Sequence, residues 1–163
     1  MAGWLRMSTA TDPVTGTDVR VARFDELSPR RLYDFLRLRS EVFVVEQECV
    51  FLDLDGRDHE PEAEHLWVDD HAGCIRLLHE DGDRWSIGRV VTRPDARSRG
   101  VAATLVRAGL ARLDALSCRH VDLGAQAHLA DWYRTLGFEV SGEPYLEDGI
   151  PHVPMSLDLG ARP

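Results

Sequence analysis

Apolar and polar positions along the first third of the chain predict a strand, a helix and a loop. Residues 19–24, VRVARF, alternate between apolar and polar and predict a strand. Ser28-Pro29 supplies a helix N-cap followed by proline at the first helical position. Apolar side chains then recur every three or four residues as far as Phe43, which predicts a helix of about four turns ending near Gln47. An acidic loop follows over residues 53–64.

The rest of the chain alternates between further strands and two helices. HLWVDD, CIRLLHE and WSIGRVVTR, separated by Asp/Gly turns, predict three strands. An amphipathic helix follows Gly100, VDLGAQ predicts a short strand, and residues 127–136 predict a helix closed by Gly137. FEVSG and HVPMSLDL complete the sheet. The order β-α-β-β-β-α-β-α-β-β predicts an α/β fold, with a mixed, twisted sheet and helices on both faces.

Length and composition predict one globular domain. Of the 163 residues, we expect 19–163 to form a single domain and 1–18, rich in Thr, Asp, Pro, Ser and Gly, to form a flexible tail. The apolar share of 44% and the charged share of 29% are typical of globular proteins, and no stretch approaches the length of a membrane span. Three cysteines without a C-x-x-C motif, and an N-terminus without a signal pattern, favour the reducing cytoplasm.

The charged residues exclude several classes of partner and cofactor. A net charge of −9 argues against a nucleic-acid partner, and the absence of lysine excludes lysine as base or nucleophile. No metal site is expected, because the histidines have no neighbouring ligand residues and the glycine of the loop 53–58 has the wrong offset for a calcium loop. That acidic loop is either a solvated turn or an anionic lip that attracts a cationic amine.

The junction between Trp85 and Leu116 is typical of an anion-binding site. A strand runs into a turn with Arg97, Arg99 and Gly100, and a helix follows. The first turn of a helix has unpaired N–H groups and a partial positive charge, and glycine lets a ligand approach the backbone closely. Neither of the common glycine-rich phosphate motifs is present. The turn therefore predicts a site for a phosphate-bearing cofactor, the alternative being an ordinary turn with solvated arginines.

This R-x-x-G-x-A turn resembles the pyrophosphate loop of the GNAT acetyltransferases, and the order of elements resembles that superfamily over roughly residues 19 to 159. Within the superfamily the chain is most similar to the ElaA-like branch. Five separated motifs carry this resemblance: Leu38-Arg39 with Val42–Gln47, then Asp53–Asp58, Ile87–Val90, Leu123–Leu129 and Glu147–His152.

The resemblance implies a GNAT acyl-CoA N-acyltransferase fold and direct transfer of an acetyl group from acetyl-CoA to an amine. In that fold the strands at 87–93 and 120–126 would splay apart, and the free edge of the first would pair with the pantetheine amides. Backbone N–H groups near Val91 and Thr92 would polarise the thioester carbonyl. The residues expected to bind the cofactor are Val90, Val91, Thr92, Arg97, Ser98, Arg99, Gly100, Val101, Ala102 and Gln126.

The resemblance also implies the general acid but leaves the general base open. Tyr133 falls where the family places a tyrosine near the CoA sulfur, and its phenol can protonate the departing thiolate; the alternative is packing under Gly137-Phe138. Many family members carry an acid near the start of the fourth strand, where this chain has Trp85-Ser86-Ile87. Glu46, at the end of the first helix, is a candidate for base or amine binder, the alternative being a carboxylate that bonds to the backbone there. His65, or a carboxylate acting through water, is the other candidate.

His65, Tyr145 and His152 are expected on the amine side of the cleft. Cys49 leaves open a route through an acyl-cysteine intermediate. Two alternative functions also remain open: an acyl-CoA-binding domain without catalysis, favoured by the altered base position, and acetylation of a protein N-terminus. The expected acceptor is accordingly a small-molecule or peptide amine. A homodimer is left open, and neither a membrane nor nucleic acid is an expected partner.

Overall fold

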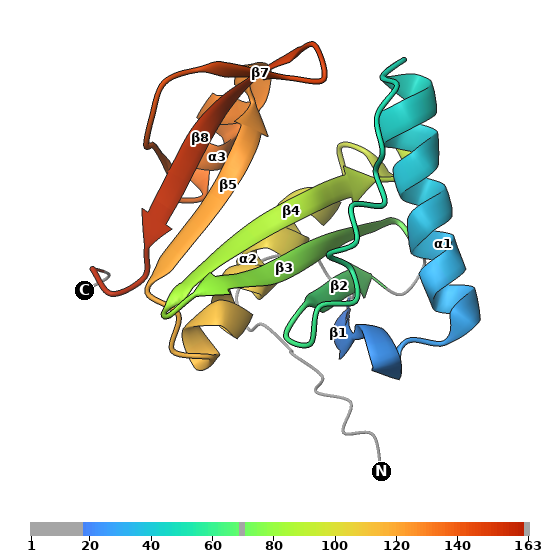
Figure 1. Cartoon of the computed structure of the whole chain (residues 1–163), viewed down its shortest axis with the longest axis horizontal. Helices are drawn as coiled ribbons and strands as arrows, with labels where there is room; N and C mark the ends of the chain where they lie inside the picture. The colour runs from blue at the N-terminus through green and yellow to red at the C-terminus, as the bar shows by residue number, and fades with distance from the viewer. Residues whose placement is uncertain (1–17, 69–70, 162–163) are drawn as a thin grey trace.

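The computed structural model describes residues 18–68 and 71–161, and in this part of the chain the strands form one mixed sheet (Figure 1). Its order is β1-β2-β3-β4-β5-β8-β6, with β7 paired to β8. Only β4 and β5 pair in parallel; the other neighbours are antiparallel. The strands are β1 (Val19–Arg23), β2 (Glu64–Val68), β3 (Gly73–Asp81), β4 (Arg84–Thr92), β5 (His120–Gln126), β6 (Glu139–Val140), β7 (Tyr145–Glu147) and β8 (Ile150–Asp158). The predicted α/β sheet is confirmed, while the tail predicted for 1–18 lies, up to residue 17, outside the described residues.

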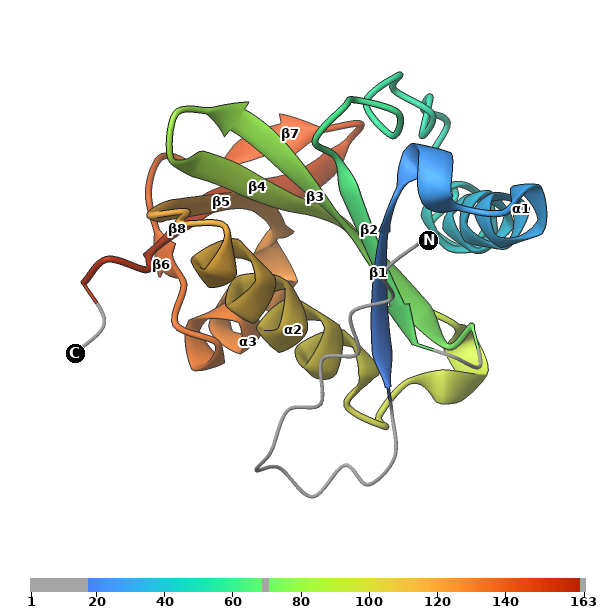
Figure 2. The same cartoon turned by 90° about the horizontal axis from the view of Figure 1, so that it is seen from below.

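Helices cover both faces of the sheet, with α1 on one face and α2 and α3 on the other (Figure 2). They are α1 (Pro29–Arg39), α2 (Val101–Ala115) and α3 (Ala130–Thr135), with short 3₁₀ turns η1 (Phe24–Glu26), η3 (Pro94–Ala96) and η4 (Ala127–Leu129). The helix predicted over 127–136 is therefore a 3₁₀ turn followed by α3. Among the described residues, no helix is long and apolar enough to cross a membrane.

The first helix begins and ends near the predicted residues, but its last part is widened. Ser28 caps α1, because its Oγ accepts a hydrogen bond from the Arg31 N–H at 3.1 Å. The chain then continues as a π-helix, η2 (Ser40–Glu46), and the Gln47 N–H donates to the Val42 carbonyl at 3.2 Å. Single π-helical turns inside α-helices are frequent at functional sites. Val42, Phe43 and Glu46 of this segment lie beside the opening between β4 and β5.

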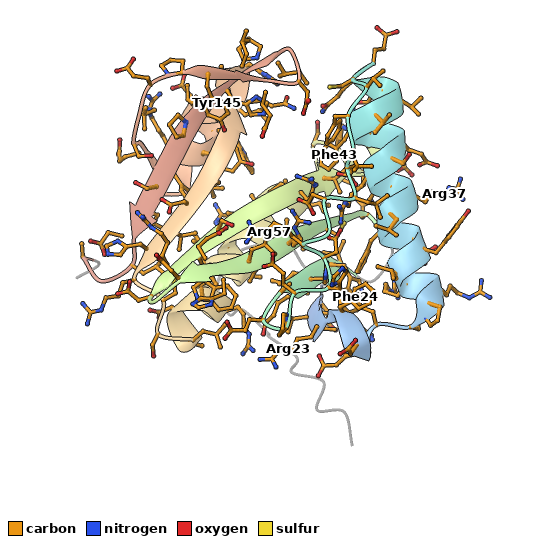
Figure 3. The ribbon with its side chains drawn as sticks, viewed as in Figure 1. Arg23, Phe24, Arg37, Phe43, Arg57 and Tyr145 are labelled. Carbon is orange, nitrogen blue, oxygen red and sulfur yellow. The ribbon has the colours of Figure 1, made fainter. Side chains whose placement is uncertain are left out.

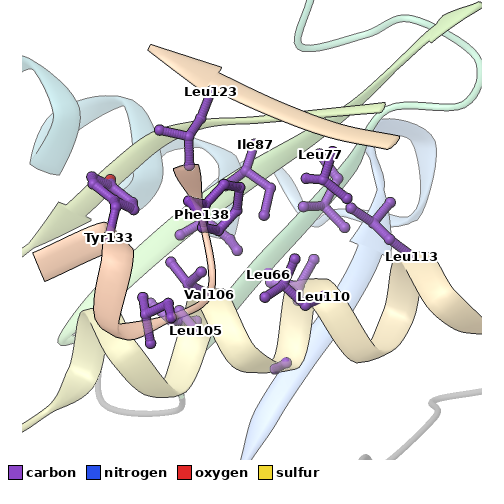
Figure 4. Packing of buried hydrophobic residues seen from close by; sticks show 14 of the residues in the cluster. Leu66, Leu77, Ile87, Leu105, Val106, Leu110, Leu113, Leu123, Tyr133 and Phe138 are labelled. Atoms are coloured by element: carbon purple, nitrogen blue, oxygen red, sulfur yellow. The ribbon is translucent and has the colours of Figure 1, made fainter. Parts of the chain in front are cut away.

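Strand alternation divides the buried side chains into two layers. Leu66 faces α2 and belongs to the large core that also contains Ile87, Leu105 and Phe138 (Figure 4). Its neighbour Trp67 faces α1 and belongs to a smaller cluster with Phe35, Leu38 and Val91. Successive strand residues point to opposite faces, so a fully buried strand contributes to both layers. Thus α1 packs on one face of the sheet and α2 packs on the other.

The two central strands separate, as predicted. β4 and β5 pair only over Arg84–Ser86 and His120–Asp122. Beyond that point β5 remains paired with β8, and β4 remains paired with β3. The backbone of β4 from residue 87 onward therefore has an uncovered edge that faces the gap (Figure 1).

A β-bulge accompanies this separation. Cys74 pairs with Val91 and Arg76 pairs with Gly88, so two steps along β3 correspond to three along β4. The extra residue is accommodated by Arg89, whose φ of 52° lies in the left-handed region. A bulge bends its strand and leaves one residue outside the ladder. It therefore adds backbone polar groups on β4 that are not used by β3, beside the opening.

Candidate functional site

The opening between β4 and β5 leads into a cleft with a volume of about 1020 Å³. Its walls come from η2 and the following loop on one side, and from β5 and the β7–β8 hairpin on the other. Figure 3 shows Phe43 on the first wall and Tyr145 on the second, and both side chains line the cleft. The cleft is large enough for the reacting ends of two substrates.

One end of the cleft carries the arginine and glycine turn. Val90, Val91 and Thr92 of β4 line it, as do Arg97 and Ala102. These five belong to the set of residues expected to bind the cofactor, and the structure brings them together.

The other residues of the turn, 98–101, adjoin this end of the cleft rather than lining it. Gly100 is the N-cap of α2 with φ 76° and ψ 13°, and Ser98 also has a positive φ, of 64°. Left-handed residues in a tight turn let neighbouring N–H groups converge on one anion. Val101, by contrast, is buried in the core, so only its backbone is available to a ligand.

Glu46 lies at the end of the cleft that carries the arginine and glycine turn, and it is paired with Arg97. Its Oε1 is 2.7 Å from the Arg97 guanidinium, and both side chains are partly exposed. The Glu46 carboxylate therefore neutralises the Arg97 guanidinium, with which an incoming pyrophosphate would have to pair. The sequence predicts that Glu46 acts on the amine side; its contact with Arg97 predicts in addition an effect of Glu46 on cofactor affinity.

We expect Glu46→Gln to bind acetyl-CoA roughly 1.4- to fivefold more tightly than wild type, because an exposed ion pair of this kind contributes about 0.2–1 kcal/mol. Isothermal calorimetry measures the change. Glu41→Gln is the matched control, since Glu41 lies on the same η2 segment and pairs with Arg37 instead. An unchanged or weaker affinity in Glu46→Gln would show that Arg97 does not exchange the carboxylate for the cofactor.

Tyr133 lies where the cleft meets the core. It lines the cleft, yet it is only 6% exposed, and its ring lies edge-on to Trp132 and Phe138 with centroids 4.7 and 6.0 Å away. Burial raises the pKa of Tyr133 to about 12. The phenol therefore stays protonated at neutral pH. Both interpretations of this residue, packing and proton donation, are compatible with its position.

The opposite end of the cleft is built by β5, β7 and β8. The Tyr145 and His152 rings stack with centroids 5.6 Å apart and an interplanar angle of 26°. Gly124 of β5 leaves room for this pair, because a Cβ at that position would lie 2.3 Å from the Tyr145 hydroxyl. Glu147 also lines this end, and its Oε2 is 3.5 Å from His152 Nε2.

Two contacts join the walls of the cleft. The Gln126 side-chain amide donates to Gln47 Oε1 at 3.3 Å, and the Cys49 thiol donates to the Asp148 carbonyl at 3.3 Å. Gln126 is one of the predicted cofactor residues, and the structure places it at the end of β5. Residues 79 and 99 positions apart in sequence thus meet over the cleft.

Comparison with known proteins identifies this architecture. The family model of the acetyltransferase (GNAT) domain matches residues 54–159. The chain belongs to the GNAT family. GNAT proteins are acyl-CoA-dependent transferases.

Proteins similar in sequence to this chain lie in the ElaA-like branch of the family. A UPF0039 protein of Mycobacterium tuberculosis is 43% identical over 137 residues, which cover 80% of this chain and 86% of the relative. The ElaA protein of Escherichia coli is 39% identical over 145 residues, covering 82% and 92%. The crystal structure of Escherichia coli ElaA superposes with a TM-score of 0.82 over 88% of this chain and all of that one, at 34% identity.

Two further solved structures add detail to this assignment. An acyl-CoA N-acyltransferase from Pseudomonas aeruginosa has a TM-score of 0.82 and 36% identity, covering 87% of this chain and 99% of its own. An aminoglycoside 6′-N-acetyltransferase was solved in complex with coenzyme A; at 16% identity and a TM-score of 0.69, over 88% of this chain and 98% of that one, it shows the shared fold. GNAT neighbours with this fold therefore bind coenzyme A.

His65 does not lie on the amine side of this GNAT cleft, which corrects our expectation. It is 3% exposed on β2, stacked against Phe35 with centroids 6.0 Å apart, and its Nε2–H donates to the Asp58 carbonyl at 2.9 Å. Burial lowers the pKa of His65, so the ring is neutral at neutral pH. It connects α1 to the acidic loop and has no route to a substrate.

The acidic loop is neither a solvated turn nor an anionic lip. Asp53 and Asp58 are buried, and Asp55 is partly covered. Each of the three aspartates contacts two arginines, and each arginine contacts two aspartates, at N–O distances between 2.6 and 3.2 Å. The members form a closed ring in the order Arg39, Asp53, Arg89, Asp55, Arg76 and Asp58. Their charges cancel, so this ring contributes no net charge to the cleft.

Metal and cysteine chemistry receive no support from the described residues. Within them, no group of three or more His, Cys, Asp or Glu side chains is arranged to hold a metal ion. All three cysteines are free and buried. Cys49 does line the cleft, but its thiol is engaged by the Asp148 carbonyl.

Sequence reasoning missed several residues that shape the cleft. Gly124 makes room for Tyr145, Glu147 faces His152, and Arg89 and Asp55 form part of the cleft wall. The one available signal was the Glu147–His152 motif, in which Asp148-Gly149 marks a hairpin turn. A hairpin there brings the residues three positions on each side of the turn, Tyr145 and His152, into register.

Proposed function

We propose that this protein transfers an acetyl group from acetyl-CoA to the amine of a small molecule or peptide, by direct attack in a ternary complex. One observation carries the proposal: a single cleft runs from the Arg97 turn, past the uncovered edge of β4, to Tyr145 and His152. Such a cleft can hold a phosphate-bearing thioester and an acceptor at the same time. No acyl-enzyme intermediate is then needed.

The cofactor would bind by adding itself to the sheet. Its pyrophosphate would rest on the backbone of the turn 97–102, at the N-terminus of α2. Its pantetheine amides would pair with the free edge of β4, where β5 has separated. The thioester carbonyl would then lie beside the bulge, where backbone N–H groups near Val91 and Thr92 stabilise the oxyanion.

Tyr133 would act as the general acid. The amine nitrogen attacks the thioester carbon, the carbon–sulfur bond breaks, and the thiolate takes the Tyr133 proton. The phenolate then recovers a proton from the attacking nitrogen. Because the pKa of Tyr133 is raised, the phenolate takes this proton readily. The acid is therefore regenerated as the amide product forms.

A cationic acceptor fits the charges that line the cleft. The guanidinium groups of Arg57, Arg76, Arg89 and Arg97 are each paired with carboxylates. Glu147 and Asp148, at the acceptor end, have no arginine partner among the described residues. The uncompensated charge is therefore negative, which favours a protonated amine.

A panel of amines, scored for CoASH release, tests the proposed function. It should contain alkylamines, arylalkylamines, polyamines and peptides with free N-termini, each offered with acetyl-CoA and with longer acyl-CoA donors. Amine-dependent CoASH release, with mass spectrometry of the acetylated product, is the expected result. Tight binding of acetyl-CoA without release for any amine would instead favour a non-catalytic acyl-CoA-binding domain. Release with peptides alone would favour N-terminal acetylation.

The cofactor site makes a separate prediction. Gly100→Glu should weaken acetyl-CoA binding well over tenfold, which is about 1.4 kcal/mol or more, as measured by calorimetry. The substitution adds a negative charge where the pyrophosphate must approach, at a residue whose φ of 76° also favours glycine.

Gly82→Glu is the matched control for this prediction. Gly82 also has a positive φ, of 52°, and lies in the β3–β4 turn, where a side chain meets nothing within 4 Å. It should therefore impose the same kind of backbone strain without touching the cofactor. If Gly100→Glu is folded and binds acetyl-CoA as well as Gly82→Glu does, the pyrophosphate does not bind at this turn.

A further inference from the structure

We infer that His152 is the general base of the proposed reaction, taking the proton from the acceptor ammonium at its Nε2. The inference rests on the proposed acetyl transfer and names the residue that the sequence leaves open. Glu46 is engaged by Arg97 at the cofactor end, and His65 is buried away from the cleft. His152 is the histidine that both lines the cleft and is held in place by its neighbours.

The hydrogen bond at Nδ1 determines where the imidazole can accept a proton. His152 Nδ1 lies 2.7 Å from the Ile150 carbonyl oxygen. A carbonyl can only accept, so Nδ1 carries the hydrogen and the neutral ring has its lone pair at Nε2. This is the arrangement that a general base requires: one nitrogen fixed as a donor, and the other free to take a proton.

A carboxylate lies on the side where the positive charge would form. Glu147 Oε2 is 3.5 Å from His152 Nε2, and Glu147 itself is largely exposed. Protonation of Nε2 would create an imidazolium beside this carboxylate, which stabilises it and offers an outlet for the proton to solvent. Glu147 is thus a positioning residue for His152.

The ring plane is fixed from a second side. Tyr145 stacks on His152, and Gly124 leaves the space that the Tyr145 hydroxyl occupies. Other titratable groups near this end are Asp148 in the turn, Cys49 opposite it, and His128 of η4. The Cys49 thiol donates to the Asp148 carbonyl, and among the described residues no hydrogen bond fixes the tautomer of His128 as the Ile150 carbonyl fixes that of His152.

The proton balance of the step is complete. The acceptor ammonium loses one proton to His152 Nε2, and the neutral amine then attacks the thioester carbon. A second proton leaves the nitrogen as the amide forms, and it replaces the one that Tyr133 gives to the thiolate. His152 passes its proton to water beside Glu147, so one proton is released for each acetyl group transferred.

The test compares an amine that arrives protonated with one that arrives neutral. Benzylamine is an ammonium at neutral pH, whereas aniline, a much weaker base, is already neutral. His152→Asn keeps a donor near Ile150, because its amide nitrogen replaces Nδ1, but it has no base. We expect it to lower kcat/KM for benzylamine about 10²-fold at neutral pH, with a loss that shrinks as the pH rises, and to leave aniline almost unaffected.

Several outcomes overturn the assignment. An equal loss for both amines at every pH would mean that His152 only supports Tyr145. Wild-type kinetics in His152→Asn would remove it from the reaction, whereas a wild-type protein without turnover of any amine would overturn the proposed function as well. Nitrogen-15 NMR of the imidazole provides a readout independent of turnover. The His152 signals are assigned as those missing from the spectrum of His152→Asn. If they show a neutral ring with its hydrogen on Nε2 rather than Nδ1, the assignment is also overturned.

Discussion

Replacing Tyr133 with phenylalanine is expected to lower kcat by about 10²–10⁴-fold while leaving the affinity for acetyl-CoA unchanged. Phenylalanine keeps the ring that packs edge-on against Trp132 and Phe138, so the core should be preserved. Only the hydroxyl is lost, and with it the proton for the departing thiolate. Steady-state CoASH release and calorimetry with acetyl-CoA measure the two quantities separately.

Tyr145→Phe is the matched control, because Tyr145 is the second tyrosine of the same cleft. We expect it to change KM for the amine more than kcat, since its hydroxyl lies over Gly124 at the acceptor end. The reverse pattern, with normal turnover in Tyr133→Phe and loss in Tyr145→Phe, would make Tyr145 the acid and leave Tyr133 as a packing residue.

The pH dependence gives a second check on Tyr133. An acid acts in its protonated form, and burial raises the pKa of Tyr133 to about 12. The wild-type kcat should therefore not fall through loss of this proton until the pH exceeds about 11. A fall at lower pH that disappears in Tyr133→Phe would contradict the buried, protonated phenol.

Much of the fold could be predicted because it depends on local patterns. Ser28-Pro29 starts α1, and the alternation around Leu66 and Trp67 places neighbouring strand residues on opposite faces. The separation of β4 and β5 followed from the family resemblance and is confirmed. The widening of the first helix into η2 was not foreseen, because a π-turn has no distinct signature in apolar spacing.

The ring of arginines and aspartates could not be predicted, because it depends on a bulge. Strict alternation along β4 would place Arg89 on the same face as Ile87, under α2. The extra residue in β4 shifts this register, and Arg89 reaches Asp53 and Asp55 on the face of α1 instead. Loop carboxylates that look solvated in sequence are therefore neutralised by strand residues distant along the chain.

The site was predicted more unevenly than the fold. The turn around Gly100 is a contiguous motif, so the sequence alone indicated an anion site there. The acceptor end depends on the β7–β8 hairpin, which brings Tyr145 over His152, and on Gly124 beneath them. His65 was misplaced because a histidine next to an acidic loop gives no indication that Phe35 covers it.

The buried ring makes the largest prediction for stability. Arg39→Met should lower the free energy of unfolding by about 3–5 kcal/mol, because it leaves three aspartates to share two arginines in a buried site. Arg39 is 2% exposed and methionine fills much of its volume, so the lost charge is the main change. Urea unfolding monitored by circular dichroism measures the difference.

Acid should have a related effect on the wild-type protein. Burial alone would raise the pKa of Asp58, but the hydrogen bond and charge of Arg39, with those of Arg76, outweigh it and hold the pKa below its usual range. A lowered pKa stabilises the folded state at pH values above the unfolded value of about 3.9. The wild-type protein should therefore lose stability as the pH falls below about 4, and Arg39→Met should lose less over that range.

Arg37→Met is the control, since Arg37 lies two residues before Arg39 on the same helix and pairs with Glu41 in solvent. It should unfold at nearly the same urea concentration as wild type.

The ring of arginines and aspartates also fixes the loop that carries Phe51 and Leu52 into the cleft wall. Below its melting temperature, folded Arg39→Met should therefore show a higher KM for the amine with normal acetyl-CoA affinity. If Arg39→Met is as stable as Arg37→Met, the ring does not hold this loop, and the acceptor wall must be fixed by the Cys49 and Gln47 contacts instead.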